Sequence, residues 1–419
     1  MITMQYRQVP KNGDQLSALG FGAMRLPTKW GSIDEERATR QIRDAIDKGV
    51  NYIDTAVPYH GGESERFLGR ALQEGYREKV KLATKLPPWS VKTRGDMDKI
   101  LDIQLKKLYT DHINYYLLHG LEANQWKKLF DLGVLEFLSS AKASGKIKNA
   151  GFSFHGDLKT FKEIIDAYDW VFCQIQYNFL DETNQAGTEG LRYAASKNIA
   201  VMIMEPLRGG MLAGKLPNKA KEIYNRTGTK RSAAEWALRW VWNHPEVTVV
   251  LSGMNDEKHI AENLKTCEDA FSGSMTADEL ATIDAIAATY KRPMRVGCTG
   301  CGYCMPCPFG VNIPQCFNLY NDYHDYHMGV NHLKIRAMYG MGLMGGIGRT
   351  PAHAALCKNC GKCMKTCPQY IMIPEELKKV SITLSGFRTK MMLPPMRLMF
   401  HTVQVARKIK TRVIIEEKP

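Results

Sequence analysis

Short apolar runs alternate with amphipathic stretches along roughly the first two thirds of the chain. A short apolar run that ends in turn residues predicts a buried β-strand, and apolar positions that recur every three or four residues predict a helix. The strands predicted in this way are 18–22, 51–53, 80–84, 113–118, 147–152, 171–176, 199–204 and 247–251. The helices predicted between them include 35–48, 64–73, 96–108, 133–144, 158–167, 187–197 and 233–242.

Eight strands that each precede a helix, over about 270 residues, predict an α/β fold of the (β/α)8 TIM barrel type. A doubly wound sheet is the alternative, but such sheets usually open with a GxGxxG turn directly after their first strand. The GxGxxG match in this chain runs from Gly340 to Gly345 and has no predicted strand before it. We therefore expect the barrel.

The chain beyond the barrel divides into two further parts. A helix predicted over 276–290 opens with Thr276 and has Glu279 three residues later, a capping-box pattern, and Pro293 ends it. We place a barrel domain at 1–290, a small, mostly helical cysteine-rich domain at 291–374, and a basic tail at 375–419. The tail has ten Lys and Arg against four Glu, so its net charge is +6 (10 − 4). It is either a solvated tail or a docking segment for an acidic surface, and we expect no nucleic acid partner.

The composition, 44% hydrophobic and 24% charged with a net charge of +14, is ordinary for a soluble protein. The first 14 residues have no apolar core of a signal peptide, and the best membrane candidate, 337–347, is far shorter than the roughly 20 residues of a spanning helix. Eight of the eleven cysteines fall into two clusters, which favours metal binding over disulfides. We expect a cytoplasmic protein without a transmembrane segment.

Four polar residues lie at or just past the ends of three successive predicted strands: Asp54, Tyr59, Lys85 and His119. In a barrel, the carboxyl ends of the strands converge on one rim, where catalytic groups gather. Tyrosine can donate a proton, a lysine can tune its acidity, an aspartate can pair with that lysine, and a histidine can orient a substrate. This combination predicts the reduction of a carbonyl.

These residues and their spacing resemble the aldo-keto reductase family over about residues 5–290. The resemblance implies that Tyr59 is the general acid, that Lys85 lowers its pKa, that Asp54 pairs with Lys85, and that His119 orients the substrate carbonyl. It also implies a cofactor, NADP(H) or NAD(H), and a small carbonyl or alcohol substrate.

The resemblance further implies a set of cofactor-binding residues. They are Ser153, Gln174, Glu205, Leu207, Arg208, Gly210, Gly253, Asn255, His259, Glu262 and Asn263. The first two would hold the nicotinamide carboxamide, the loop 205–210 the phosphates, and the last two the adenine side. Gly253 and His259 stand where NADP-preferring members often have Lys and Arg, so NAD and NADP both remain open. Candidates for the substrate mouth, with core packing as the alternative, are His60, Trp89, Phe154, His155 and Tyr177.

The two cysteine clusters follow the spacing of ferredoxins. The second contains Cys357, Cys360, Cys363 and Cys367 before a proline, which is the bacterial [4Fe–4S] run. The first contains Cys298, Cys301, Cys304 and Cys307 before a proline, with a last gap one residue shorter. Two-cluster ferredoxins exchange their fourth ligands, so Cys367 would complete the first cluster and Cys307 the second. Zinc is the alternative metal, but eight cysteines with this spacing favour two [4Fe–4S] clusters.

Barrel and cysteine domain together resemble the branch of aldo-keto reductases that carries a C-terminal ferredoxin-type domain. We therefore expect an NAD(P)(H)-dependent oxidoreductase that interconverts a carbonyl and an alcohol, with Tyr59 as general acid. The alternative is an electron-transfer subunit or redox-sensing protein whose barrel binds nicotinamide and whose clusters pass single electrons to a redox protein partner.

Overall fold

The computed structural model describes residues 3–214, 216–291, 294–324, 332–345 and 350–387, together with 389, 391 and 394. Contacts between Cα atoms divide the chain into two compact units. The first contains 1–215 and 224–287, and the second contains 216–223 and 288–419. The division lies close to the boundary that the sequence predicts at residue 290. Among the described residues, no helix combines the length and apolar character needed to cross a membrane.

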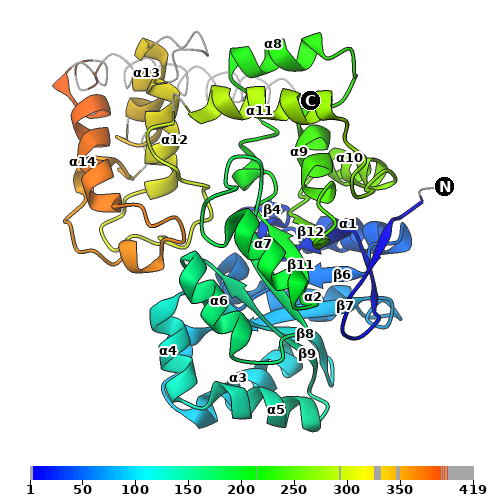
Figure 1. Cartoon of the computed structure of the whole chain (residues 1–419). Helices are drawn as coiled ribbons and strands as arrows, with labels where there is room; N and C mark the ends of the chain where they lie inside the picture. The colour runs from blue at the N-terminus through cyan, green and yellow to red at the C-terminus, as the bar shows by residue number, and fades with distance from the viewer. Residues whose placement is uncertain are drawn as a thin grey trace, which may run out of the picture. The chain divides into compact units, whose positions relative to one another are not determined.

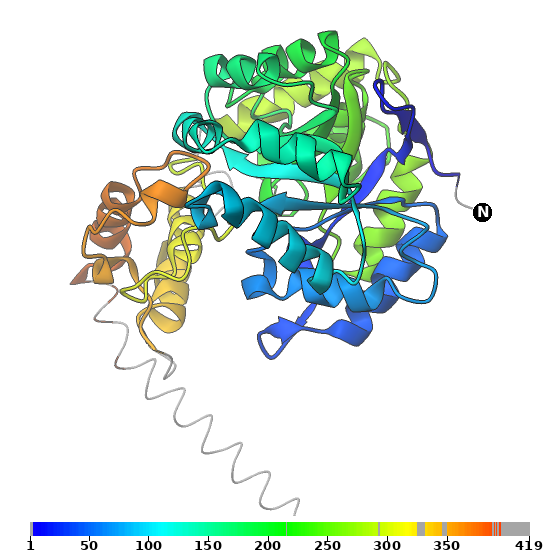
Figure 2. The ribbon, with the colours of Figure 1, turned by 90° about the horizontal axis from the view of Figure 1, so that it is seen from below.

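The first unit is a closed barrel of eight parallel strands, so the predicted fold is confirmed. The strands are paired in the order β10-β11-β12-β3-β6-β7-β8-β9, and helices surround them (Figure 1, Figure 2). The strands are β3 (Leu19–Gly22), β6 (Tyr52–Asp54), β7 (Lys81–Leu86), β8 (Ile113–Leu121), β9 (Ile147–Phe154), β10 (Phe172–Gln176), β11 (Ala200–Met204) and β12 (Val247–Ser252).

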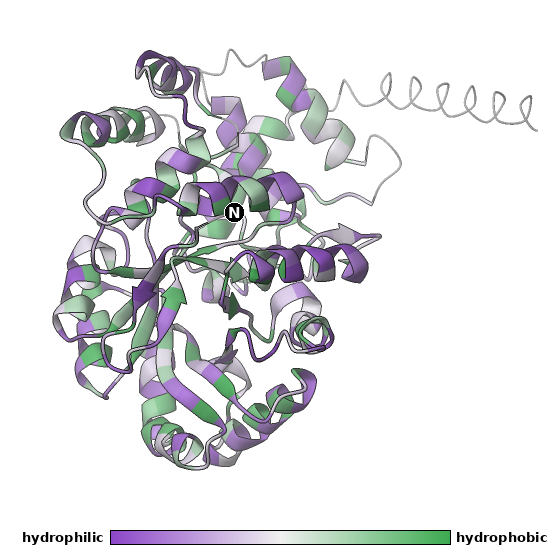
Figure 3. Ribbon diagram, turned by 90° about the vertical axis from the view of Figure 1, so that its right-hand side faces the viewer, coloured by the Kyte–Doolittle hydropathy of each residue, from purple (hydrophilic) through white to green (hydrophobic). Residues whose placement is uncertain are grey.

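The barrel helices pack an apolar face onto the strands and expose a polar face, as the alternating colours of Figure 3 show. In the first of them, Ala38, Ile42 and Ala45 are buried, and Asp34 caps the amino end by accepting a hydrogen bond from the Arg37 amide. The helices are α1 (Glu35–Asp47), α2 (Ser64–Ala71), α3 (Arg94–Lys107), α4 (Ala123–Asp131), α5 (Val134–Ala143), α6 (Leu158–Asp166), α7 (Gly187–Ser196), α9 (Ala233–Trp242), α10 (Glu257–Cys267) and α11 (Ala277–Lys291).

An amino-terminal hairpin, which the sequence patterns did not predict, covers the end of the barrel where the strands begin. Its strands are β1 (Tyr6–Gln8) and β2 (Gln15–Ser17). The Tyr115 hydroxyl donates to Asp14 at 2.7 Å, and the Asn12 side chain donates to Asn149 at 2.9 Å. The hairpin therefore lies at the end opposite the rim on which the strands finish. A second hairpin, β4 (Thr28–Lys29) and β5 (Ser32–Ile33), follows β3 on that rim side.

The second unit is mainly helical, with α12 (Ile313–His324), α13 (His332–Gly342) and α14 (Ile373–Leu384). Phe317, Tyr339, Leu377 and Val380 lie in one buried core, against which six of the clustered cysteines pack. The boundary that the sequence places between 374 and 375 falls inside α14, because its apolar face continues the core to Leu384. Helix α8 (Asn218–Arg226) begins in the chain segment grouped with this unit. Most of the predicted tail, from residue 395 onward, lies outside the described residues.

Candidate functional site

The four polar residues predicted to act together come from three neighbouring strands of the barrel. Asp54 is the last residue of β6, and Tyr59 opens the short 3-10 helix η2 (Tyr59–Gly62) that follows. Lys85 lies near the end of β7, and His119 lies near the end of β8. Because β6, β7 and β8 are adjacent in the barrel, the side chains meet at one part of the rim.

A buried ion pair forms the centre of this group. The Lys85 ammonium donates to both carboxylate oxygens of Asp54 at 2.7 Å and to the Thr55 carbonyl at 2.8 Å. The Tyr59 hydroxyl lies 3.5 Å from the same nitrogen. Lys85 is 1% exposed, Asp54 2% and Tyr59 8%, so water hardly screens these contacts. The geometry thus brings together an ammonium, its counter-ion and a phenol.

Burial and charge act in opposite directions on this pair. Burial raises the pKa of Asp54, and the Lys85 charge offsets part of that rise. Burial lowers the pKa of Lys85, and Asp54 offsets part of that fall. For His119, burial is the main cause of a pKa well below the ordinary value, and the Lys85 charge lowers it further. A histidine in this state is neutral near pH 7, so it can orient a carbonyl but cannot serve as a cationic acid.

Two of the predicted mouth residues surround His119, and two belong to the core. The Trp89 ring lies 5.2 Å from the His119 ring and is 55% exposed, and His155 lowers the pKa of His119 by proximity. Phe154 is fully buried against other aromatic rings, and so is Tyr177, whose hydroxyl contacts Thr188 and His244. His60 accepts a hydrogen bond from the Leu26 amide at 3.1 Å.

A buried carboxylate lies behind Lys85 and was not predicted from the sequence. Glu65 on α2 is fully buried, and it accepts hydrogen bonds from Thr84 and Gln104, each at 2.8 Å. The same Gln104 nitrogen donates to the Lys85 carbonyl at 2.9 Å, so this network holds the strand that carries Lys85. The sequence did contain a sign of this carboxylate: Glu65 is a charged residue among the apolar positions, such as Phe67 and Leu68, that form the buried face of α2.

The two residues predicted to hold the carboxamide lie side by side. Ser153 on β9 and Gln174 on β10 are paired in register, and both are buried. The Ser153 oxygen accepts a hydrogen bond from the Gly120 amide at 2.7 Å, which leaves its proton for another acceptor. The Gln174 amide nitrogen contacts the Met204 sulfur at 3.7 Å.

The predicted phosphate loop leaves β11 at Glu205 and turns through the 3-10 helix η4 (Arg208–Gly210). Glu205, Arg208 and Gly210 all have positive φ, so the backbone turns tightly here. Arg208 is 8% exposed, and its Nε donates to the buried carboxylate of Asp181 at 3.0 Å. Its charge is therefore partly compensated inside the protein, which the sequence did not indicate.

The residues predicted on the adenine side occupy α10 and the loop before it. Asn263 is buried and donates to the Ser252 hydroxyl at the end of β12, at 3.0 Å. Glu262 is hydrogen-bonded to Ser232, which caps α9. Gly253, Asn255 and His259 are exposed. Asn263 and Glu262 thus hold local structure, while the other three face solvent.

Arg25 Nη2, Gln174 Oε1 and Glu205 Oε2 are buried polar atoms without a hydrogen-bond partner among the described residues. They follow β3, lie on β10 and follow β11, around one part of the rim. Arg25 crosses Gly253, where a Cβ would come within 3.1 Å of it. Buried polar groups normally have partners, so this arrangement fits a polar ligand such as a dinucleotide. Arg25 was not singled out from the sequence, because it belongs to no local pattern.

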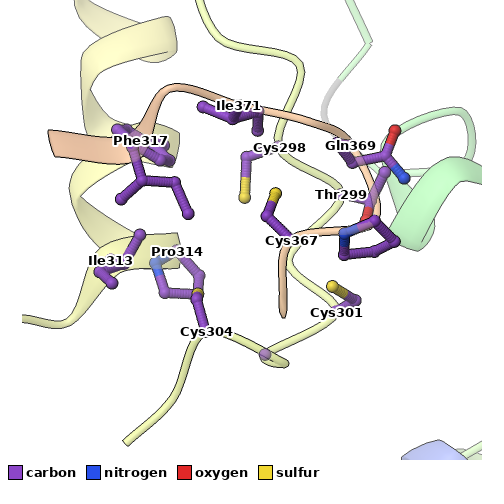
Figure 4. A pocket seen from close by; sticks show the side chains of 13 residues that line it. Cys298, Thr299, Cys301, Cys304, Ile313, Pro314, Phe317, Cys367, Gln369 and Ile371 are labelled. Carbon is purple, nitrogen blue, oxygen red and sulfur yellow. The ribbon is translucent and has the colours of Figure 1, made fainter. Parts of the chain in front are cut away.

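In the second unit, the eight clustered cysteines form two groups of four. Cys298, Cys301, Cys304 and Cys367 line one pocket, with apolar neighbours that include Phe317 (Figure 4). In Figure 4 the sulfur atoms of Cys298 and Cys367 point toward one another from two distant segments of the chain. Burial raises the pKa of the Cys304 thiol, and the nearby sulfurs of the other three raise it further.

The second group, Cys307, Cys357, Cys360 and Cys363, lines a second pocket, which Cys304 of the first group also borders. The pKa of the Cys363 thiol is raised by burial and then by the other three sulfurs. The thiols that act on Cys304 and on Cys363 thus form two groups, each of which combines three cysteines of one motif with the last cysteine of the other. This is the exchanged arrangement that the ferredoxin spacing predicts.

The two motifs also share their local geometry. The Gly300 amide donates to the Cys298 sulfur at 3.4 Å, and the Asn359 amide donates to the Cys357 sulfur at 3.5 Å. Both donors have positive φ, so the backbone turns in the same way directly after each contact. Such N–H···S contacts stabilise negative charge on thiolate ligands and tune the potential of an iron–sulfur cluster.

The spacing of the sulfurs bears on the choice between zinc and iron–sulfur clusters. No three Cys, His, Asp or Glu side chains in the described part of the chain gather closely enough to ligate one metal ion. A zinc ion needs four ligands at about 2.0–2.3 Å from a single point. In a [4Fe–4S] cluster each thiolate binds a different iron, so the sulfurs surround a space. The cysteines of each group line a pocket, so the residues present fit the second form.

Comparisons with known proteins agree with the architecture. The sequence profile of the Aldo/keto reductase family matches residues 18–288, and that of a 4Fe-4S dicluster domain matches residues 297–373. Aldo-keto reductase YhdN of Bacillus subtilis is 29% identical over 60% of this chain and 85% of its own length. Methylglyoxal reductase YeaE of Escherichia coli is 27% identical over 67% of this chain and 95% of its own.

Among solved structures, aldo-keto reductase AKR11C1 of Bacillus halodurans in its holo form has a TM-score of 0.58 and 26% identity. The match covers 68% of this chain and 96% of that one. The family profile covers more than half of the chain, and the barrel it describes is the barrel observed. The chain belongs to the aldo/keto reductase family and carries a 4Fe-4S dicluster domain after its barrel.

Proposed function

We propose that the barrel is an NAD(P)(H)-dependent oxidoreductase that interconverts a small carbonyl compound and an alcohol, with Tyr59 as general acid and base. The observation that carries this proposal is the buried Lys85–Asp54 pair with the Tyr59 hydroxyl 3.5 Å from the ammonium. A pocket that only bound a nucleotide would not need the Tyr59 phenol beside the Lys85 ammonium, because this pair is not required to hold a phosphate. The relative named methylglyoxal reductase supports a small carbonyl as substrate.

Each of the four polar residues on the rim has a separate role in the reaction that we propose. A bound nicotinamide supplies or accepts the hydride. Tyr59 gives its proton to the carbonyl oxygen, and the Lys85 ammonium stabilises the phenolate that remains. Asp54 keeps Lys85 charged and in place, since a buried ammonium without a counter-ion would lose its proton. The neutral His119 donates a hydrogen bond that orients the carbonyl.

For the cofactor, we propose Ser153 and Gln174 as partners of the carboxamide, and the turn of Glu205, Leu207, Arg208 and Gly210 as the phosphate loop. The Gln174 Oε1 atom has no partner among the described residues, so it can accept a hydrogen bond from the carboxamide, and this supports the first part of the assignment. The exposed loop and first turn that contain Gly253, Asn255 and His259 would face the adenosine, beside Glu262 and Asn263. This part has no Lys or Arg at 253 or 259, so it supports NAD(H) and NADP(H) alike.

For the second unit, we propose two [4Fe–4S] clusters, one in each cysteine pocket. Iron–sulfur clusters move one electron at a time, whereas a nicotinamide moves two as hydride. We therefore assign the clusters to exchange with a redox protein partner and not to the hydride step. We also propose a location in the reducing cytoplasm, where clustered cysteines bind metal and seldom form disulfides.

A second candidate, an electron-transfer or redox-sensing protein, rests on the two complete cysteine pockets. One experiment separates it from the enzyme. Full-length protein, purified without oxygen, is assayed for reduction of methylglyoxal and simple aldehydes with NADPH and NADH. We expect Tyr59→Phe to lower kcat by about 10²–10⁴, the usual contribution of general acid catalysis, with little change in cofactor affinity. Tyr109→Phe, a change at a 62% exposed tyrosine, is the matched control. Equal turnover by Tyr59→Phe and wild type would refute the enzyme proposal.

A further inference from the structure

One ligand of the second cysteine pocket lies at the surface. Of the eight cysteines in the two motifs, Cys360 is exposed and the other seven are only partly so. Electron transfer between proteins depends on a short path, so an exposed ligand marks the edge of a cluster that a partner can approach. This edge is the starting point for the inference.

Three lysines lie around Cys360 in the same segment. Lys358, Lys362 and Lys365 are exposed, and none forms an ion pair with a residue that the structure describes. Elsewhere in this unit, by contrast, Lys379 pairs with Glu376 at 2.6 Å. The sequence between 326 and 374 contains six Lys and Arg and no Asp or Glu. Among the residues that the structure describes, the charge of these three lysines therefore has no counter-ion.

Apolar side chains lie beside these lysines. Met305 is 37% exposed and Phe309 41% exposed, and both line the second cysteine pocket together with Lys358 and Lys362. Exposed apolar groups within a rim of like charges are typical of small, transient interfaces between proteins, in which charge guides the encounter. We call the surface formed by Cys360, these three lysines, Met305 and Phe309 the lysine face.

We propose that the lysine face docks a small acidic protein that carries single electrons, of the ferredoxin type. This inference rests on the proposed [4Fe–4S] content of the second pocket. At each encounter the reduced carrier loses one electron and the cluster beside Cys360 gains it; no bond forms or breaks and no proton moves. Lysines on the face attract the acidic carrier, and the apolar side chains let the two surfaces approach closely at the exposed ligand.

The test uses full-length protein, purified without oxygen, whose iron and sulfide are measured first. The probe is an acidic two-cluster ferredoxin, reduced beforehand, and stopped-flow absorbance follows the reduction of the protein's clusters at several salt concentrations. Equilibrium affinity for the oxidised ferredoxin is measured by calorimetry. The variant is Lys358→Glu/Lys362→Glu, and the control is Lys99→Glu/Lys106→Glu, which reverses two exposed lysines of α3 in the barrel.

At low salt we expect the lysine-face variant to react and bind at least about 10-fold more weakly than wild type, with little remaining salt dependence. The control should match wild type, and a neutral small-molecule reductant should reduce all three proteins equally. The inference is overturned if the control falls as far as the variant, or if clusters are present and the ferredoxin reduces variant and wild type alike. Absence of iron and sulfide would instead refute the proposed clusters, and this inference with them. A variant that has lost iron is replaced by Lys358→Gln/Lys362→Gln, for which we expect the same direction and a smaller effect.

Discussion

Replacing Lys85 by Met separates the structural role of the buried ion pair from the role in proton transfer that we propose for it. Met has a similar shape but no charge, so Lys85→Met leaves the Asp54 carboxylate buried without a counter-ion. Removing one partner of a buried pair costs about 3–5 kcal/mol of unfolding free energy. The phenolate also loses an ammonium at 3.5 Å, worth about 5 kcal/mol at an effective dielectric constant near 20. If the transition state loses that energy, kcat falls by a factor of about 10³–10⁴.

The double variant Lys85→Met/Asp54→Asn tests this division. It removes the uncompensated charge, so we expect much of the lost stability to return in urea titrations followed by tryptophan fluorescence. Turnover should not return, because the ammonium beside Tyr59 is still missing. We would measure kcat for aldehyde reduction by the loss of nicotinamide absorbance, and cofactor affinity by fluorescence. If kcat recovers together with stability in the double variant, the ion pair serves folding alone and our reasoning about Tyr59 is wrong.

Further predictions concern other parts of the molecule. Burial lowers the pKa of His155 to about 4, below its ordinary value of 6.5, so the folded protein binds fewer protons than the unfolded chain between these values. Unfolding free energy should therefore fall as the pH drops from about 6.5 to about 4, by up to about 3 kcal/mol, and His155→Gln should remove this part of the pH dependence in urea titrations. Cys367→Ser should reduce the iron content from about eight atoms towards four, because one cluster of four irons loses a ligand while the other keeps all of its own. Gln174→Leu should weaken cofactor binding by about 2- to 10-fold in fluorescence titrations, the loss of one hydrogen bond. Gly69→Ala should destabilise the barrel, because its Cβ would come within 2.3 Å of a backbone oxygen, whereas Gly95→Ala in an open helix position should stabilise it by up to about 1 kcal/mol.

The barrel could be predicted because each of its strands is a short apolar run, which is the pattern of a strand buried on both sides. The predicted strand ends were less accurate. Lys85 and His119 lie inside β7 and β8, although their polarity suggests the end of a strand. Polar residues can continue a strand on the rim of a barrel, where a site and not the core surrounds them. The amino-terminal hairpin escaped prediction because its strands, of three residues each, are too short to show alternation.

The meeting of Asp54, Tyr59, Lys85 and His119 on one part of the rim could be predicted because these residues follow successive strands, so order along the chain determines nearness in space. The residues that support it could not. Glu65 meets Gln104 across 39 positions, and Arg208 meets Asp181 across 27, and no local pattern connects either pair. The grouping of the cysteines, by contrast, could be predicted from a local pattern, because the ferredoxin spacing indicates which thiols lie together.

The exchange of cysteines between the two pockets has a mechanical consequence. A cluster bound by Cys304 and Cys367 at once would tie together two points of the chain that enclose α12 and α13. Like a disulfide across a loop of this size, such a tie would reduce the conformational entropy of the unfolded chain and so raise the free energy of unfolding by about 4 kcal/mol. Loss of the cluster through oxidation by oxygen would then remove this tie. The segment between Cys304 and Cys367 would unfold more easily, and proteases would cleave it faster.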